Sequence, residues 1–189
     1  MRNRPRLAPA GYPVTGLYPA AARSFRPWKN GGGETAEILC WPEGAGIDDF
    51  TLRLSTARVA ASGPFSTFPG VDRVLTVIEG GAMVLTLDGT DHPLAPGIPP
   101  FAFAGDQPCT AQLVGPPLLD FNVMTRRPLQ AQVTTGPLAP DARFALLLAP
   151  AAGLARLDLV DLDHADPNLV AALTGTPAIA VHLPSALPG

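Results

Sequence analysis

The sequence predicts an all-β protein, built as a barrel or a sandwich of short strands. Its 189 residues include 23 prolines and 19 glycines, which recur between short apolar segments and leave few stretches of helical period. The dipeptides Gly80-Gly81 and Asp88-Gly89 favour tight turns that join neighbouring strands as hairpins. Many short strands at such spacing are typical of closed or two-layered β architectures.

Ten segments have the composition of strands and are bounded by turn residues. They are Thr35–Trp41, Phe50–Val59, Asp72–Glu79, Ala82–Asp88, Thr110–Val114, Leu118–Thr125, Gln130–Thr135, Arg143–Ala149, Ala155–Asp161 and Ala178–Leu183. The segment Asp72–Glu79 is apolar on both faces, as a central covered strand would be. Residues 166–173 indicate a short helix, with Asp166 as its cap and Pro167 at its first position.

Alternation within two of these strands separates a polar face from an apolar one. Arg53 and Ser55 point away from the leucines that flank them, because successive side chains of a strand lie on opposite faces. Asp120 and Asn122 share a face in the same way, opposite to Phe121. We expect the apolar faces to form the core and the polar faces to be available for a site.

The amino-acid composition changes near Arg126-Arg127-Pro128, after which alanine, leucine and proline become more frequent. We therefore predict two halves, residues 1–125 with the unusual polar residues and residues 126–189, packed as one compact unit. The chain begins as an irregular arm, since prolines and glycines between residues 9 and 16 interrupt the apolar core that a secretory signal needs. No apolar run approaches the ~20 residues that span a bilayer, and we expect a cytoplasmic protein.

Composition also restricts the partners and the cofactors. The formal net charge of −3 disfavours nucleic acid and membranes as partners, because both require a basic face. Cys40 and Cys109 are far apart in sequence, and we expect two buried free thiols. The three histidines, His92, His164 and His182, are isolated from one another, which argues against a metal site.

Three clusters can carry chemistry. The first, residues 26–37, contains the chain's single lysine, Lys29, next to Trp28 and Asn30 and before three consecutive glycines. It is either a tight turn or a ligand loop, and it lacks the Lys-Ser/Thr spacing of a phosphate-binding loop. The second, residues 63–73, ends in Asp72 and Arg73, whose charges are either paired or directed at a ligand. The third combines Gly105-Asp106 with residues 120–126.

Residues 63–80 and 94–109 resemble the two motifs of the cupin superfamily. In metal-binding cupins this frame carries two histidines and a glutamate, followed by a third histidine. The approximate equivalents in this chain are Ser66, Phe68, Arg73 and Cys109. The resemblance therefore implies a cupin without a metal or another cofactor.

A more specific resemblance, to the HutD/Ves family, covers about residues 25–127. It rests on Trp28-Lys29-Asn30-Gly31-Gly32-Gly33 with Thr35 and Glu37, Arg53-Leu54-Ser55, Gly63-Pro64-Phe65-Ser66, Phe68-Pro69-Gly70-Val71-Asp72-Arg73, Phe103 with Gly105-Asp106, and Asp120-Phe121-Asn122-Val123-Met124. It implies a cupin-like double-stranded β-helix with two cupin-like halves packed as one unit, often as a homodimer. It also implies a role in histidine utilisation, with N-formylglutamate or a related intermediate as the ligand.

A small carboxylate ligand requires fixed cations, and Lys29, Arg53 and Arg73 are the candidates. Asn30 and Asn122 can form hydrogen bonds with an amide or formyl group of the ligand, while Asp106 or Asp120 can hold the cations in place. The expected ligand-binding residues are Trp28, Lys29, Asn30, Arg53, Ser55, Arg73, Asp106, Asp120 and Asn122.

Three functions remain open from the sequence. The first is a binding protein that senses or buffers a metabolite of histidine breakdown. The second is a metal-free cupin enzyme, an isomerase or hydrolase that transfers protons through an aspartate or Lys29. The third is a stress-related interaction protein. A Ser-His-Asp triad is not supported, because no histidine lies in the three clusters.

Overall fold

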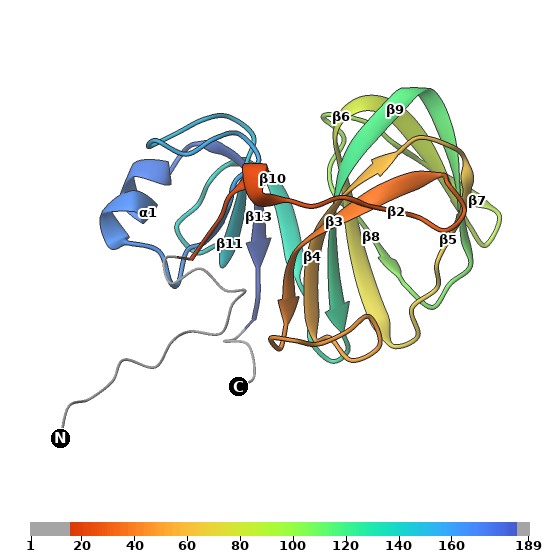
Figure 1. The fold of residues 1–189 in the computed structure, drawn as a ribbon, viewed down its shortest axis with the longest axis horizontal. Helices are drawn as coiled ribbons and strands as arrows, with labels where there is room; N and C mark the ends of the chain where they lie inside the picture. The colour runs from red at the N-terminus through yellow and green to blue at the C-terminus, as the bar shows by residue number, and fades with distance from the viewer. Residues whose placement is uncertain (1–15, 185–189) are drawn as a thin grey trace.

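The computed structural model describes residues 16–184, which form two antiparallel sheets side by side (Figure 1). The larger sheet has the strand order β2 (Arg26–Pro27), β3 (Gly33–Trp41), β4 (Leu52–Val59), β9 (Cys109–Arg126), β6 (Val71–Leu87) and β7 (Thr90–Leu94), with β5 (Gly63–Phe65) on β9 and β8 (Phe101–Ala104) on β6. The smaller sheet has the order β1 (Leu17–Tyr18), β12 (Leu159–Asp161), β11 (Phe144–Leu147), β13 (Pro177–His182) and β10 (Gln132–Pro137). The fold is all-β, as predicted, and consistent with a cupin-like double-stranded β-helix. The arm expected at the start of the chain, residues 1–15, lies outside the described residues.

Two very long strands replace four of the predicted short ones. β6 runs through Gly80-Gly81, so the hairpin turn expected there is wrong, and β9 runs through Gly115-Pro116-Pro117 beside it. The pairing of β6 with β9 shifts register twice near the glycines, where both strands bend. A Cβ on Gly81 would lie 2.7 Å from the carbonyl oxygen of Val114, so only glycine lets the backbones approach this closely. The glycine pair therefore bends a continuous strand instead of ending it.

Two other local predictions are confirmed. Asp88 and Gly89 both have positive φ values, 48° and 77°, and join β6 to β7 as a two-residue hairpin turn. Helix α1 (Pro167–Leu173) begins with a proline, and the side chain of Asp166 accepts a hydrogen bond of 2.8 Å from the backbone N–H of Asn168. Turn and cap signals are local, which is why they can be read from the sequence.

The main core lies between the two sheets. It joins leucines and aromatic residues of the larger sheet to those of the smaller one, namely Leu39, Leu52, Leu54, Val74, Phe121, Val123, Phe144, Leu146, Leu159, Ile179 and Val181. The apolar face predicted for β4 and β9 is therefore confirmed as a core face. A second cluster, which includes Leu75, Met83 and Phe103, fills part of the interior of the larger, curled sheet. Helix α1 packs against a third cluster on the smaller sheet through Leu173.

The two sheets do not follow a single cut of the sequence near residue 125. β9 ends at Arg126 and β10 starts at Gln132, but β1 precedes the larger sheet and pairs with β12 in the smaller one. A short 3₁₀ helix, Ala20–Ala22, then leads the chain across to β2. Residues 17–18 therefore belong structurally with the second half of the chain.

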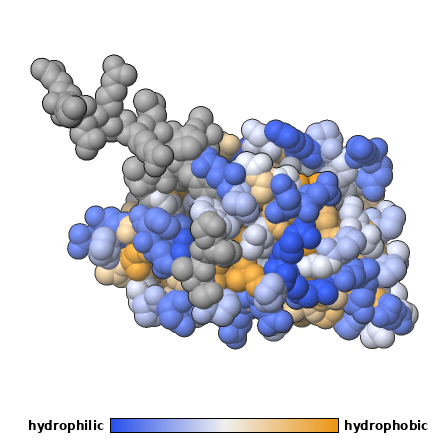
Figure 2. Space-filling model, turned by 90° about the horizontal axis from the view of Figure 1, so that it is seen from below, coloured by the Kyte–Doolittle hydropathy of each residue, from blue (hydrophilic) through white to orange (hydrophobic). Residues whose placement is uncertain are grey.

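The surface carries few large apolar side chains. Figure 2 shows mostly hydrophilic side chains on the face seen from below, with smaller hydrophobic areas between them. Among the described residues the large exposed hydrophobic ones are Ile47, Ile98 and Val114, which come from separate segments. Within residues 16–184 no helix is long and apolar enough to cross a membrane. Cys40 and Cys109 are both buried thiols that form no disulfide, as predicted.

Candidate functional site

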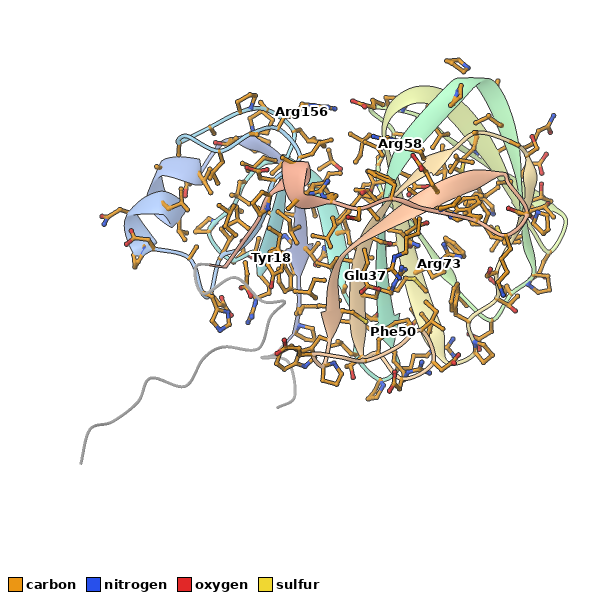
Figure 3. All side chains as sticks on the ribbon, in the orientation of Figure 1. Tyr18, Glu37, Phe50, Arg58, Arg73 and Arg156 are labelled. Carbon is orange, nitrogen blue, oxygen red and sulfur yellow. The ribbon has the colours of Figure 1, made fainter. Side chains whose placement is uncertain are left out.

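A cavity of about 310 Å³ opens in the larger sheet, which is within the range of small-molecule sites. Its walls come from β3, β4, β6, β9 and the segments before β3, before β4 and around β5. The lining residues are Trp28, Asn30, Thr35, Ile47, Arg53, Ser55, Ala57, Pro64, Phe65, Ser66, Phe68, Arg73, Asp120, Asn122 and Met124. Figure 3 shows Arg73 near the middle of this sheet's lobe, with Arg58 toward one end and Phe50 toward the other.

One side of the cavity is built from three neighbouring strands in register. Met124 on β9 lies between Arg53 on β4 and Arg73 on β6. Asn122 and Asp120 follow on the same face, at successive levels along the strand. Because a strand rises by about 3.3 Å per residue, the backbone positions of Met124 and Asp120 are about 13 Å apart. Along β9 the cavity wall therefore carries two arginines beside Met124, then the amide of Asn122, then the carboxyl group of Asp120.

Arg73 is a buried cation held among aromatic rings. The residue is 6% exposed, and its guanidinium carbon lies 5.3, 5.5 and 5.1 Å from the ring centroids of Phe65, Phe68 and Phe103. One terminal nitrogen donates a 3.5 Å hydrogen bond to the carbonyl oxygen of Ser66, and its Nε is buried without a partner among residues 16–184. No salt bridge joins Arg73 to a described carboxylate.

The charge of Arg73 persists at neutral pH. Burial lowers the pKa of its guanidinium to about 10, while the field of Asp120 opposes that shift. A buried charge normally requires a close countercharge, because desolvation without one costs several kcal/mol. The cavity next to Arg73 is where such a countercharge can bind.

Arg53 is tied to the protein more firmly than Arg73. Its Nε donates to the carboxylate of Glu37 at 2.9 Å, and Nη1 donates to the hydroxyl of Ser55 at 3.3 Å. Its Nη1 also contacts the sulfur of Met124 at 3.7 Å. These contacts fix the guanidinium at the edge of the cavity, with part of its charge already neutralised. Glu37 was noted only as part of the family resemblance and not as a site residue.

Asp120 and Asn122 each present an oxygen without a hydrogen-bond partner. Asp120 is 2% exposed and Asn122 is 8% exposed, and the Oδ1 atom of each is buried and unpaired among the described residues. Burial raises the pKa of Asp120 from 3.8 to about 7, against the opposing effects of Arg73 and of a backbone hydrogen bond with Ala57. At neutral pH Asp120 therefore exists in both its neutral and its ionised form.

The glycine-rich segment is a tight hairpin that positions Trp28. The indole Nε1 donates a 2.7 Å hydrogen bond to the hydroxyl of Thr35, and the indole meets the ring of Phe65 edge-on, with centroids 6.5 Å apart. Asn30 accepts a 3.0 Å hydrogen bond from the N–H of Gly32. The two interpretations of this cluster, a turn and part of a pocket, are thus compatible.

Replacing Gly33 by alanine is expected to disturb this wall. A Cβ at residue 33 would lie 3.0 Å from an indole carbon of Trp28 and would collide with the carbonyl oxygen of Arg58. Overpacking of this kind typically costs about 1–3 kcal/mol, which urea denaturation of the variant measures. Gly63→Ala is the control, because a Cβ there meets no atom within 4 Å. Equal stability of the two variants would contradict the prediction.

Two of the nine expected site residues do not line the cavity. Lys29 lies exposed in the hairpin turn. Asp106 is exposed and forms an ion pair with Arg127, which also contacts Asp72 at 3.0 Å. This pairing holds the pKa of Asp106 below its usual value. Asp106 therefore supports Arg127 and not the arginines of the cavity, a pairing across loops that spacing in the sequence does not reveal.

The other seven predicted residues do line the cavity, and several lining residues were not predicted as such. Ser66 and Phe68 were noted only as equivalents of cupin metal positions and as parts of the family motifs, and Phe65 only as part of a family motif. Ile47 comes from the segment between β3 and β4 and has no distinguishing sequence signal. The described part of the chain contains no group of three or more His, Cys, Asp or Glu side chains that could hold a metal ion.

Comparison with known proteins supplies the remaining evidence. The model of the HutD family matches residues 20–166. The structure of HutD from Pseudomonas fluorescens SBW25, determined in a formate condition, is 32% identical, with 88% of this chain and 96% of that chain covered and a TM-score of 0.69. A conserved protein of unknown function from Pseudomonas aeruginosa PAO1 is 30% identical, with coverages of 88% and 91% and a TM-score of 0.63.

Proposed function

The chain belongs to the HutD family, and from this premise we propose that it binds a small carboxylate in the cavity of its larger sheet. Family membership associates the protein with histidine utilisation. The ligand that we propose is N-formylglutamate or a related intermediate, which the protein senses or buffers. A binding role requires a cavity, a charge complementary to the ligand and a few oriented polar groups.

The observation that supports this proposal most strongly is that Arg73 is a buried cation without a salt-bridge partner among the described residues. Its guanidinium is buried among three phenylalanine rings, lines the cavity, and has no salt-bridge partner among the described residues. A carboxylate is the natural complement, since it can accept two parallel hydrogen bonds from one guanidinium. Arg53, fixed by Glu37, adds a second cation on the other side of Met124.

The polar groups at the next level suit an acyl or amide substituent. Asn122 and Ser55 lie opposite each other on β9 and β4, and both line the cavity. Asn30 approaches from the β2–β3 hairpin. A cavity of about 310 Å³ fits a metabolite of the size of N-formylglutamate.

Calorimetry against a panel of histidine, urocanate, formiminoglutamate, N-formylglutamate and glutamate tests the proposal. We expect the formylated or formiminated glutamates to bind best, because they combine a carboxylate with a group that Asn122 can read. Absence of binding by every carboxylate of the panel would refute the proposed function. In that case the better-supported function is that of a stress-related interaction protein.

Arg53→Ala is expected to weaken binding of N-formylglutamate by roughly 5- to 30-fold, about 1–2 kcal/mol. The loss is moderate because Glu37 already occupies one edge of the guanidinium. Arg58→Ala is the matched control on the same strand, since Arg58 pairs with Glu34 outside the cavity and is 59% exposed. If Arg53→Ala and Arg58→Ala bind as the parent does, Arg53 is purely structural.

A metal-free isomerase or hydrolase is the second candidate, and Asp120 is the observation that favours it. A buried carboxyl group with a pKa of about 7 is suited to proton transfer near neutral pH. Incubation of N-formylglutamate with the protein, followed by NMR, distinguishes the two functions. Conversion that is lost in Asp120→Asn supports the enzyme, and an unchanged ligand supports the binding protein.

A further inference from the structure

We propose that Asp120 recognises the ligand as a neutral carboxylic acid, donating a hydrogen bond to an uncharged acceptor of the ligand while Arg73 holds the ligand's carboxylate. Binding then takes up a proton whenever Asp120 is ionised in the free protein. This inference rests on the proposed function and specifies the ligand class further. The ligand is an anion with an uncharged acceptor, such as an acyl oxygen, at its other end.

The placement of Asp120 supports a donor role. It lies at the level of the cavity farthest along β9 from the arginines, opposite Ala57 on β4 and Val77 on β6. Both neighbours are apolar, and the carboxyl oxygen Oδ1 has no partner among the described residues. In its neutral form the group can donate one hydrogen bond, and a ligand acceptor in the cavity satisfies it.

The charges around Asp120 determine the direction of proton exchange. Of the fifteen lining residues only Arg53, Arg73 and Asp120 carry ionisable groups. Arg73 on β6 is the cation whose field acts on Asp120, whereas Arg53 on β4 faces Glu37 of β3. β3 itself lines the cavity with Thr35, and the hairpin with Trp28 and Asn30, none of which titrates near neutral pH.

A bound carboxylate shifts this balance toward the neutral acid. Its negative charge offsets the charge of Arg73, which is the main influence that favours ionised Asp120. The pKa of Asp120, already raised to about 7 by burial, therefore rises further in the complex. By linkage, a group that binds a proton more tightly in the complex makes ligand affinity fall as the pH rises above its pKa in the free protein.

Calorimetry with N-formyl-L-glutamate, at pH values from about 6 to about 8.5 and in two buffers of different ionisation enthalpy, tests the inference. We expect the Kd of the parent to rise by roughly 10- to 30-fold across this range, with uptake of up to about one proton per ligand at the alkaline end. Asp120→Asn keeps a donor of the same shape but cannot titrate. Its Kd should stay within about twofold of the parent value at pH 6 and remain flat.

Two further variants control the experiment. Asp120→Ala lacks the donor, and we expect weaker binding than in Asp120→Asn at every pH, again with a flat profile. Asp106→Asn removes a carboxylate outside the cavity and should retain the slope of the parent. Circular dichroism confirms that each variant is folded before binding is measured.

The outcomes separate this inference from the proposed function. Binding by the parent with a flat pH profile, or an equal slope in Asp120→Asn, overturns the role of Asp120 and leaves carboxylate binding intact. Absence of binding at every pH overturns the proposed function, and the inference with it. A slope and proton uptake that disappear only in the Asp120 variants support the inference.

Discussion

Replacing Arg73 by alanine is expected to weaken binding of N-formylglutamate by roughly 30- to 5,000-fold, about 2–5 kcal/mol. The effect is larger than at Arg53 because Arg73 is buried, remains charged, and has no protein carboxylate to satisfy it among residues 16–184. An ion pair formed in a desolvated site loses its full strength when one partner is truncated, since the other charge is then left unpaired. Isothermal calorimetry at neutral pH measures the loss.

Matched variants separate the charge of Arg73 from its packing. Arg73→Met fills a similar volume between Phe65, Phe68 and Phe103 without a charge, and it should bind as weakly as Arg73→Ala. Arg73→Lys restores a charge but not the two-pronged geometry, and we expect intermediate affinity. If Arg73→Met binds like the parent, the guanidinium serves only to fill space and the anion site lies elsewhere.

Asp120→Asn is expected to stabilise the protein increasingly as the pH rises from about 4 to about 7. The pKa of Asp120 is raised from 3.8 to about 7 in the folded protein, so the folded state retains a proton that the unfolded state releases in this window. The free energy of unfolding of the parent therefore falls as the pH rises. In Asp120→Asn residue 120 does not titrate, so it causes no such decrease in the free energy of unfolding. Raising the pKa from 3.8 to about 7 corresponds to a destabilisation of about 4 kcal/mol above pH 7, as an order of magnitude.

Urea denaturation of the parent and of Asp120→Asn at several pH values measures this difference. Near pH 4 the two proteins should agree to within about 1 kcal/mol, because both side chains are then neutral. Asp106→Asn is a control in which the pH dependence of the stability difference has the opposite sign. Because Arg127 lowers the pKa of Asp106, this variant should be less stable than the parent at neutral pH but not in acid. A stability difference between Asp120→Asn and the parent that does not change with pH would contradict a raised pKa at Asp120.

Much of the site was predictable because it depends on alternation within single strands. The polar residues of β4 and β9 share the cavity face, whereas Leu54 and Phe121 pack between the sheets, as the pattern indicates. Lys29 and Asp106 do not line the cavity, for a common reason. Their position depends on how a loop leaves its strand and on which partner, such as Arg127, lies nearest in space. Periodicity carries no information about either.

The sequence by itself determined the all-β class, the Asp88-Gly89 hairpin, the capped helix α1 and the polar faces of two strands. Each of these follows from interactions between residues close together in the chain or from a period of two. Only the tertiary structure decided that β6 continues through Gly80-Gly81 and that β1 joins the second sheet. It also decided that Arg73 lies among three aromatic rings and that Asp120 is desolvated. Both depend on contacts between distant segments, because burial and the field of neighbouring charges exist only once the strands are assembled.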